Sequence, residues 1–304
     1  MRFFKRRGGD PQPSDRFEWV TSTARRILAE RGVETTVLHG PQPQDVVLVG
    51  ADTQRYPLFN VFAKTEDVPI SAAEQIVAAH LDSLLAGDDS RAPGELSPEQ
   101  LRQQVRTRLL SAGESAPGQP TFDYARPFSE GIISVLCLDF PTTVVLVTDA
   151  NVGTLALGLG ELYAFGQLNT DAEPVDRRFE PFPGIEVIVG DSLFTASKAA
   201  NLPAVLGSAP WGTLFTVPHR HMLVALPITG PETIGALQQL VAYTVQIVGE
   251  GLVPGGVISP DVHFSRDGIV SRVSSTTPDG RITLHVDARL QHALETATTP
   301  DQPA

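Results

Sequence analysis

The chain has 304 residues with 23 Lys or Arg against 35 Asp or Glu, a formal net charge of −12 at pH 7, and this negative field argues against general nucleic-acid binding. Hydrophobic residues make up 41% and there is one cysteine, Cys137, so the chain can bury a core but forms no internal disulfide. No run of apolar residues is as long as the about 18 residues that a helix needs to span a bilayer. The N-terminus also lacks the apolar region of a secretory signal. We therefore expect a cytoplasmic protein without an integral membrane segment.

The first part of the chain predicts a small domain behind a basic arm. Residues 1–14 combine Lys and Arg with Gly and Pro, and predict a disordered arm. Residues 15–87 predict an αβββα domain. Its expected elements, in order, are a helix over 16–31, strands over 33–38, 45–49 and 56–62, and a helix that begins with a capping box of Ser71 and Glu74 and ends at Gly87.

Residues 88–127 are rich in Pro, Gly and Ser and predict a connector between domains. One helix is expected inside it, with Ser97 as the N-cap and Pro98 at the first helical position.

Residues 128–295 predict a larger mixed-sheet α/β domain, followed by a disordered tail over 296–304. The elements expected in this domain are strands over 132–138, 144–147 and 185–189, helices over 151–168 and 193–201, a hairpin of 213–217 with 222–226, a helix over 232–248, and strands over 262–265, 269–273 and 282–286. The fold class is therefore α+β or mixed α/β in two domains.

Gly190-Asp191-Ser192-Leu193 follows an apolar strand and resembles the nucleophile block of the GDSL hydrolases. In that reading Ser192 is the nucleophile, Asp191 belongs to the same turn, and His219, His221 or His263 is the base. The other conserved blocks of those hydrolases have no match in this sequence. In their Asp/His block two residues separate the acid from the histidine, whereas Asp261-Val262-His263 has only one residue between them. The alternative is that Asp191 or Ser192 caps the helix that follows.

His219 and His221 are two residues apart at the expected start of a strand, so their side chains would share one face. A pair of this kind can hold a metal if Asp191, Asp261 or His263 completes the set. The alternative is that His219 and His221 are solvated side chains at the tip of the hairpin and bind no metal. No nucleotide-binding loop or other cofactor motif is present, so the sequence predicts no cofactor.

Three further residues have side chains of the kind used in binding or reactive sites. Cys137 lies in an apolar run, which predicts a buried and inert thiol. Trp211 is a candidate anchor for a protein partner, or else covers the edge of the core. Arg220, in the turn of the expected hairpin, is the second candidate binding residue.

Four stretches resemble the YtpQ-like family of bacterial proteins of unknown function, over roughly 16–275. The stretches are Leu58-Phe59-Asn60-Val61-Phe62 with the helix after it, Gly190-Asp191-Ser192 through Ala196-Ser197-Lys198, Val217-Pro218-His219 with the strand from Met222, and Gly251-Leu252-Val253-Pro254 with 257–273. The resemblance implies that Gly190-Asp191-Ser192 opens a helix in a fold other than that of the GDSL hydrolases. It also implies that His219 belongs to a recurring turn.

No complete catalytic set is present in the sequence, which favours a non-enzymatic binding or adaptor protein with a protein partner. A serine hydrolase at Ser192 and a metal site at His219 and His221 are the alternatives. The sequence contains no signal for an oligomeric state.

Overall fold

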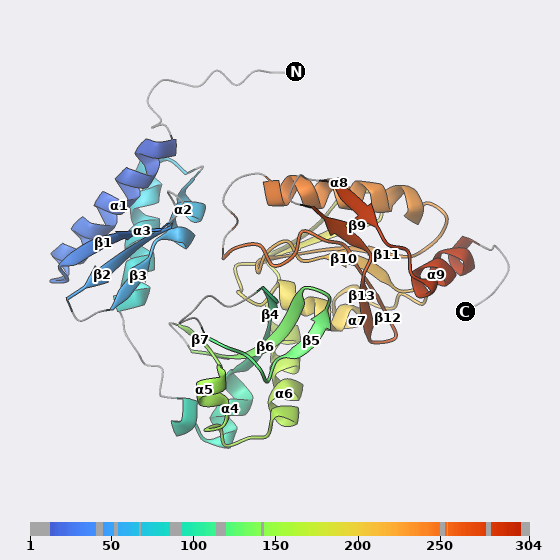
Figure 1. The fold of residues 1–304 in the computed structure, drawn as a ribbon, viewed down its shortest axis with the longest axis horizontal. Helices are drawn as coiled ribbons and strands as arrows, with labels where there is room; N and C mark the ends of the chain where they lie inside the picture. The colour runs from blue at the N-terminus through green and yellow to red at the C-terminus, as the bar shows by residue number, and fades with distance from the viewer. Residues whose placement is uncertain are drawn as a thin grey trace. The chain divides into compact units, whose positions relative to one another are not determined.

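The computed structural model describes residues 13–40, 45–51, 54–66, 68–85, 93–113, 120–140, 143–249, 253, 255–277 and 281–298. The chain forms two compact units, Met1–Asp89 and Ser90–Ala304. Both combine helices with antiparallel sheets, which confirms the predicted mixed α+β class (Figure 1). The expected basic arm, Gly87 at a helix end, and the residues 299–304 of the expected tail lie outside the described residues.

Among its described residues, the first unit has one antiparallel sheet, in the order β1-β2-β3, and three helices. Its elements are α1 (Pro13–Glu30), β1 (Thr35–His39), β2 (Val46–Gly50), β3 (Arg55–Pro57), α2 (Phe59–Thr65) and α3 (Ile70–Leu85). The apolar positions that predicted the first helix, Val20, Ala24, Ile27 and Leu28, are all buried. Phe17 of α1 packs edge-on against Phe62 of α2, with ring centroids 4.9 Å apart.

Two expectations for this unit are wrong. Residues 56–62 were expected to be one strand, but the strand ends at Pro57 and the carbonyl oxygen of Leu58 accepts hydrogen bonds from the amides of Val61 and Phe62. These bonds start α2 and bury its apolar side chains. Ser71 is not the N-cap of α3, because the carbonyl oxygen of Pro69 accepts from the amides of the first turn and the helix begins at Ile70.

The second unit contains a six-stranded antiparallel sheet in the order β13-β12-β10-β11-β9-β8. Its strands are β8 (Arg177–Phe182), β9 (Ile185–Val189), β10 (Thr213–Thr216), β11 (Met222–Pro227), β12 (His263–Arg266) and β13 (Ile269–Arg272). The helices α8 (Thr233–Gly249) and α9 (Ala288–Thr298) supply side chains to the core on one face of the sheet, where Figure 1 shows α8 running along it.

The other face packs on a second apolar core. Its side chains come from the 3-10 helix η2 (Ala196–Asn201), from α7 (Leu202–Leu206) and from a four-stranded sheet in the order β4-β6-β5, with β7 also paired to β6. The remaining elements are η1 (Pro93–Glu95), α4 (Pro98–Gln104), β4 (Val105–Ser111), β5 (Arg126–Ser129), β6 (Ile132–Asp139), β7 (Val144–Leu146), α5 (Asp149–Val152), α6 (Leu159–Ala172), β14 (Ser274–Thr276) and β15 (Ile282–Leu284).

The connector expected over 88–127 is wrong for residues 105–111. The helix within it is confirmed, because Ser97 accepts from the amide of Gln100, the Gln100 side chain accepts from the amide of Ser97, and Pro98 stands at the helix start. However, β4 follows at once and pairs with β6 along its whole length. Val105, Thr107 and Leu109 are buried at alternate positions, so this segment belongs to the core of the second unit.

Most other elements of the second unit agree with the sequence. The hairpin of β10 and β11, the strand pair of β6 and β7, and the long helix α8 are confirmed. The helix expected over 193–201 is instead η2 followed by α7, and the helix expected over 151–168 begins at Leu159. The expected tail is wrong for 296–298, which continue α9. Within the described ranges, no helix has both the length and the apolar character that a bilayer crossing requires.

Candidate functional site

The structure brings together the two polar motifs that the sequence singled out. Strand β9 pairs antiparallel with β11, with Val189 opposite Met222, so the turn after β9 lies beside the turn before β11. The amide of Gly190 donates to the carbonyl oxygen of His221 at 3.1 Å, and Nδ1 of His221 lies 3.1 Å from the carbonyl oxygen of Gly190. We call this site, made of Gly190–Ser192 and His219–His221, the loop junction.

Ser192 is held by a carboxylate. Its hydroxyl donates to Oε2 of Glu173 at 2.9 Å and accepts from the amide of Phe194 at 3.2 Å. The other carboxylate oxygen of Glu173 accepts from Nε of Arg106 at 2.9 Å. Among the described residues, no histidine is hydrogen-bonded to Ser192. Asp191 is exposed, and its amide donates to Asp176. The 3-10 helix that follows, η2, has Thr195 at its N-cap and no side-chain capping bond, so neither Asp191 nor Ser192 caps it and the capping alternative is wrong. The arrangement also lacks the base that a nucleophilic serine needs.

His263 lies in a different place, fully buried on β12. Its Nδ1 is 2.8 Å from the hydroxyl of Ser129, and its Nε2 is 3.1 Å from the hydroxyl of Ser259. Burial, aided by the charge of Arg272, lowers the pKa of His263 to about 4. An imidazole with this pKa is a weak base. Both hydrogen-bond partners of its ring nitrogens in the described chain are serine hydroxyls and neither is a carboxylate, so this histidine does not complete a Ser-His-Asp set.

Asp261, which the sequence placed beside His263, points elsewhere. Its Oδ1 accepts from the amide of Thr276 at 2.9 Å, and its Oδ2 is 3.5 Å from the guanidinium of Arg272. The serines that contact His263 were not found by sequence reasoning. Ser129 stands 134 residues away along the chain, and no local pattern joins the two positions.

His219 and His221 precede β11 and are not within it, so the expected shared strand face is wrong. Their ring centroids are 6.2 Å apart, and the amide of His221 donates to Nδ1 of His219 at 3.3 Å. Burial, together with the charges of the neighbouring His221 and Arg220, lowers the pKa of His219 to about 4. Across the described ranges, no group of three or more His, Cys, Asp or Glu residues is placed to hold a metal ion.

The two candidate binding residues have different surroundings. Trp211 is partly buried and packs against the core under α8, which fits its alternative role at the core edge. Arg220 donates from Nε to Nε2 of His221 at 3.0 Å, and its carbonyl oxygen accepts from the amide of Ala196. Cys137 is fully buried, and burial raises the pKa of its thiol to about 12, so the thiol is protonated and unreactive.

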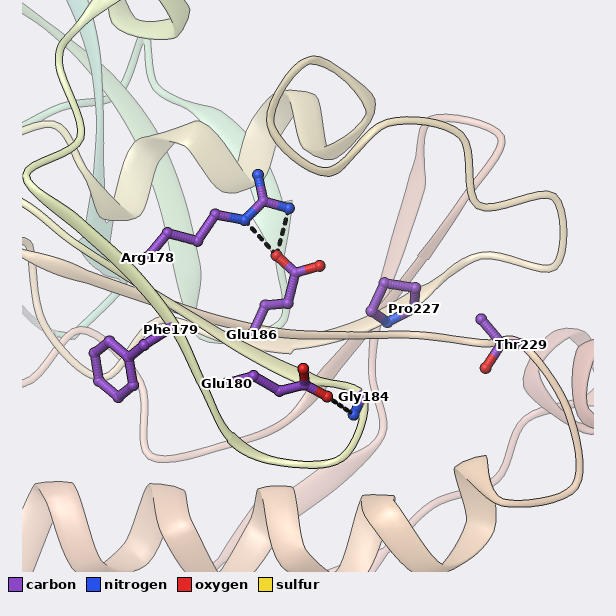
Figure 2. Close-up of a pocket in the computed structure, with 7 residues that line it drawn as sticks. All are labelled: Arg178, Phe179, Glu180, Gly184, Glu186, Pro227 and Thr229. Atoms are coloured by element: carbon purple, nitrogen blue, oxygen red, sulfur yellow. Dashed lines mark hydrogen bonds and ion pairs between the residues drawn. The ribbon is translucent and has the colours of Figure 1, made fainter.

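Two adjoining hollows, of about 380 and 450 Å³, flank the turn between β8 and β9. Both touch Gly184 and Thr229, and we call them together the β8 groove. Figure 2 shows the first, where Arg178 and Glu186 point toward one another and Phe179 points away from them. The carboxylates in the two linings are those of Glu180, Glu186 and Glu232, against the single guanidinium of Arg178.

Comparisons of the chain with protein-family models, with curated proteins and with solved structures found no match.

Proposed function

We propose that this protein is a non-enzymatic adaptor of the cytoplasm, and that its β8 groove binds a basic, partly apolar segment of a protein partner. The observation that carries the proposal is the composition of the groove. Three carboxylates face one guanidinium there, and the apolar part of the lining includes Phe179, Pro183 and Ala236. A surface of this kind complements lysine or arginine side chains that alternate with apolar ones.

The position of β8 supports this proposal. It is the last strand in the order of the six-stranded sheet, and all but one of its residues are exposed. Phe179 and Phe182 remain 39% and 37% exposed although they belong to a sheet. An edge strand with exposed aromatic side chains is a common place for a partner to dock.

The same strand limits how a partner can bind. The pairing of β8 with β9 shifts register between Phe179 and Phe182, and Pro181 within this interval has no amide hydrogen to donate. Proline and register shifts are devices that prevent uncontrolled strand addition. We therefore assign recognition to side chains that enter the hollows, with main-chain pairing limited to the part of β8 before Glu180.

The carboxylates of the groove retain charge that a partner can use. Glu186 pairs with Arg178, whereas Glu180 accepts from the amide of Gly184 and Glu232 accepts from the hydroxyl of Thr229. Hydrogen bonds from neutral donors leave the negative charge of Glu180 and Glu232 uncompensated. These two residues are the expected contacts for a cationic side chain.

The test is the binding of a fluorescent peptide in which lysine and valine alternate, measured by anisotropy with the full chain. We expect saturable binding that weakens with salt, and a loss of about tenfold in affinity in the double variant Glu180→Gln/Glu232→Gln. This variant removes both charges and keeps one acceptor oxygen at each position for the bonds to Gly184 and Thr229. Glu99→Gln on α4 is the matched control, since it removes the same charge away from the groove. Equal binding of a peptide with glutamate in place of lysine, or unchanged binding by the double variant, would overturn the proposal.

A further inference from the structure

Strand β8 carries opposite charges in an order that complements a second copy of the same strand. Its first four residues, Arg177, Arg178, Phe179 and Glu180, are all exposed. The strand is the last in the order of its sheet, and within the described ranges it pairs with β9 alone. Its outer edge is therefore open to a strand from another molecule.

The side chains on either side of Phe179 lie on the face of the sheet opposite to its ring, because side chains alternate along a strand. Arg178 precedes Phe179 and pairs with Glu186, and Figure 2 shows Phe179 pointing away from both. Glu180 follows Phe179 where the register shifts, and β8 has one residue more than β9 there, so that Glu180 also stands opposite Glu186. Arg178 and Glu180 therefore share one face.

The charges select one register for a symmetric pair of β8 strands. In an antiparallel pair related by a two-fold axis, the central residue lies opposite its own copy, and its two neighbours lie opposite each other on one face. A pair centred on Arg178 brings two guanidinium groups together, and a pair centred on Glu180 brings two carboxylates together. A pair centred on Phe179 places Arg178 of each copy opposite Glu180 of the other. Only this last register joins opposite charges.

The other face of the pair is aromatic. In this register the two Phe179 rings lie opposite each other, and each ring is 39% exposed in the single chain. Arg177 lies over its own Phe179, with Cζ 5.5 Å from the ring centroid. Among the described residues Arg177 has no ion pair, so its charge is available to the aromatic ring of the second copy.

We propose that the segment bound at the β8 groove is strand β8 of a second copy of this chain. This inference rests on the proposed function, because it takes the same groove as the docking surface and names the partner segment. Arg177, Arg178 and Phe179 are the basic and apolar side chains that the groove complements. Both copies are engaged equally, so the assembly closes as a dimer. Pro181 and the register shift keep the contact short, and side chains supply most of it.

Sedimentation equilibrium of the full chain from about 5 to 500 µM tests for this dimer, since a small interface gives a weak complex. We expect the average mass to rise from one chain toward two over this range. Glu180→Arg sets guanidinium groups against guanidinium groups and should weaken the dimer at least about tenfold. Glu99→Arg, the same change at an exposed position of α4, is the matched control.

A mixture of two variants tests whether the charges act directly across the axis. Arg178→Glu alone should also weaken the dimer, because it sets carboxylates against carboxylates. In an equimolar mixture with Glu180→Arg, each mixed dimer regains two attractive pairs, and dimerisation should exceed that of either variant alone. Damage to the fold by either substitution would not be repaired by mixing.

A cysteine crosslink tests the register itself and does not depend on the charge variants. Cys137 is fully buried, so a new cysteine on β8 is the reactive one. In Phe179→Cys the two Cα atoms would lie about 4.5–5.5 Å apart, within the range of a disulfide. In Phe182→Cys, three residues from the axis and 37% exposed at the start, the two copies would lie about 20 Å apart. Mild oxidation should crosslink Phe179→Cys and leave Phe182→Cys monomeric.

The inference fails if the chain is monomeric throughout the concentration range, if Glu180→Arg leaves the dimer intact, or if both cysteine variants crosslink equally. A monomeric chain that still binds the lysine and valine peptide would refute the dimer and leave the proposed function standing. A dimer with the expected crosslink but no peptide binding would instead refute the adaptor function, and β8 would serve self-association alone.

Discussion

The hydroxyl of Ser192 donates a hydrogen bond of 2.9 Å to Oε2 of Glu173, whose other oxygen is bonded to Arg106. This bond joins the turn after β9 to the segment after α6, and through Arg106 to β4. A serine in this position stabilises the contact between three elements. Its hydroxyl proton is directed at a carboxylate and not at an imidazole.

Replacing Ser192 with Ala should lower the free energy of unfolding by about 1.5–3 kcal/mol, because one hydrogen bond to a partly buried carboxylate is lost. Urea unfolding followed by the fluorescence of Trp211 measures the change. Ser83→Ala on α3 removes an exposed hydroxyl that bonds within its own helix, and should change stability by less than about 0.5 kcal/mol.

The same serine should not react with a fluorophosphonate probe. Nucleophilic attack requires a base that takes the hydroxyl proton, and Ser192 has no histidine among its hydrogen-bond partners in the described chain. Mass spectrometry of the probe-treated protein tests this expectation. Labelling of the wild type that disappears in Ser192→Ala would contradict it and revive the hydrolase alternative.

His263 should make the second unit less stable in mild acid. Its pKa is about 4 when folded and near 6.5 when unfolded, so between these values the unfolded chain binds a proton that the folded chain does not. Stability is therefore full above about pH 6.5 and falls as the pH drops toward 4, by up to about 1.4 kcal/mol per pH unit for one group. Burial also lowers the pKa of His219, so this histidine should change the stability with pH in the same direction.

Urea unfolding at a series of pH values tests this linkage. His263→Gln should flatten the pH dependence of the free energy of unfolding by the contribution of one histidine. His292→Gln, which removes an imidazole from an exposed position of α9, is the matched control. A wild-type curve that is flat from pH 7 to pH 5 would show that His263 is not held neutral by burial.

Gly212 and Gly207 form a matched pair that separates crowding from backbone strain. Both have positive φ, +97° and +82°. A Cβ at Gly212 would lie 2.6 Å from Cε2 of Phe264 and 2.7 Å from the carbonyl oxygen of Ser265, whereas nothing lies within 4 Å at Gly207. Gly207→Ala should cost about 1–3 kcal/mol for the backbone alone, because φ of +82° with ψ of −165° is a conformation that only glycine adopts readily. Gly212→Ala should cost about 1–3 kcal/mol more, because Phe264 is fully buried and cannot move aside.

The cap of α4 is the most local of these tests. Ser97 accepts from the amide of Gln100 at 3.3 Å, and the amide of Ser97 donates to the Gln100 side chain at 3.0 Å. Ser97→Ala should cost about 1 kcal/mol, and Ser97→Asp, which keeps an acceptor at the cap, should recover most of it. Equal losses in both variants would contradict the capping role.

Helices and hairpins with strong local signals were predictable. The helix α8 and the hairpin of β10 with β11 follow from apolar spacing over neighbouring residues, and the cap at Ser97 follows from residues three positions apart. The strand β4 was not predicted, because Arg106 and Arg108 alternate with its buried residues inside a polar stretch. Its identity as a strand depends on pairing with β6, which begins more than twenty residues later.

The sequence by itself determined the two-unit α+β character, the local helices and hairpins, and the absence of any complete catalytic motif. The tertiary structure alone decided that Gly190 meets His221 and that Ser192 meets Glu173. The physical reason is the distance along the sequence over which each kind of interaction acts. Spacing and capping act over a few residues and can be found in the sequence, whereas strand order β10-β11-β9 and the packing of β4 beneath it join segments that no local pattern connects.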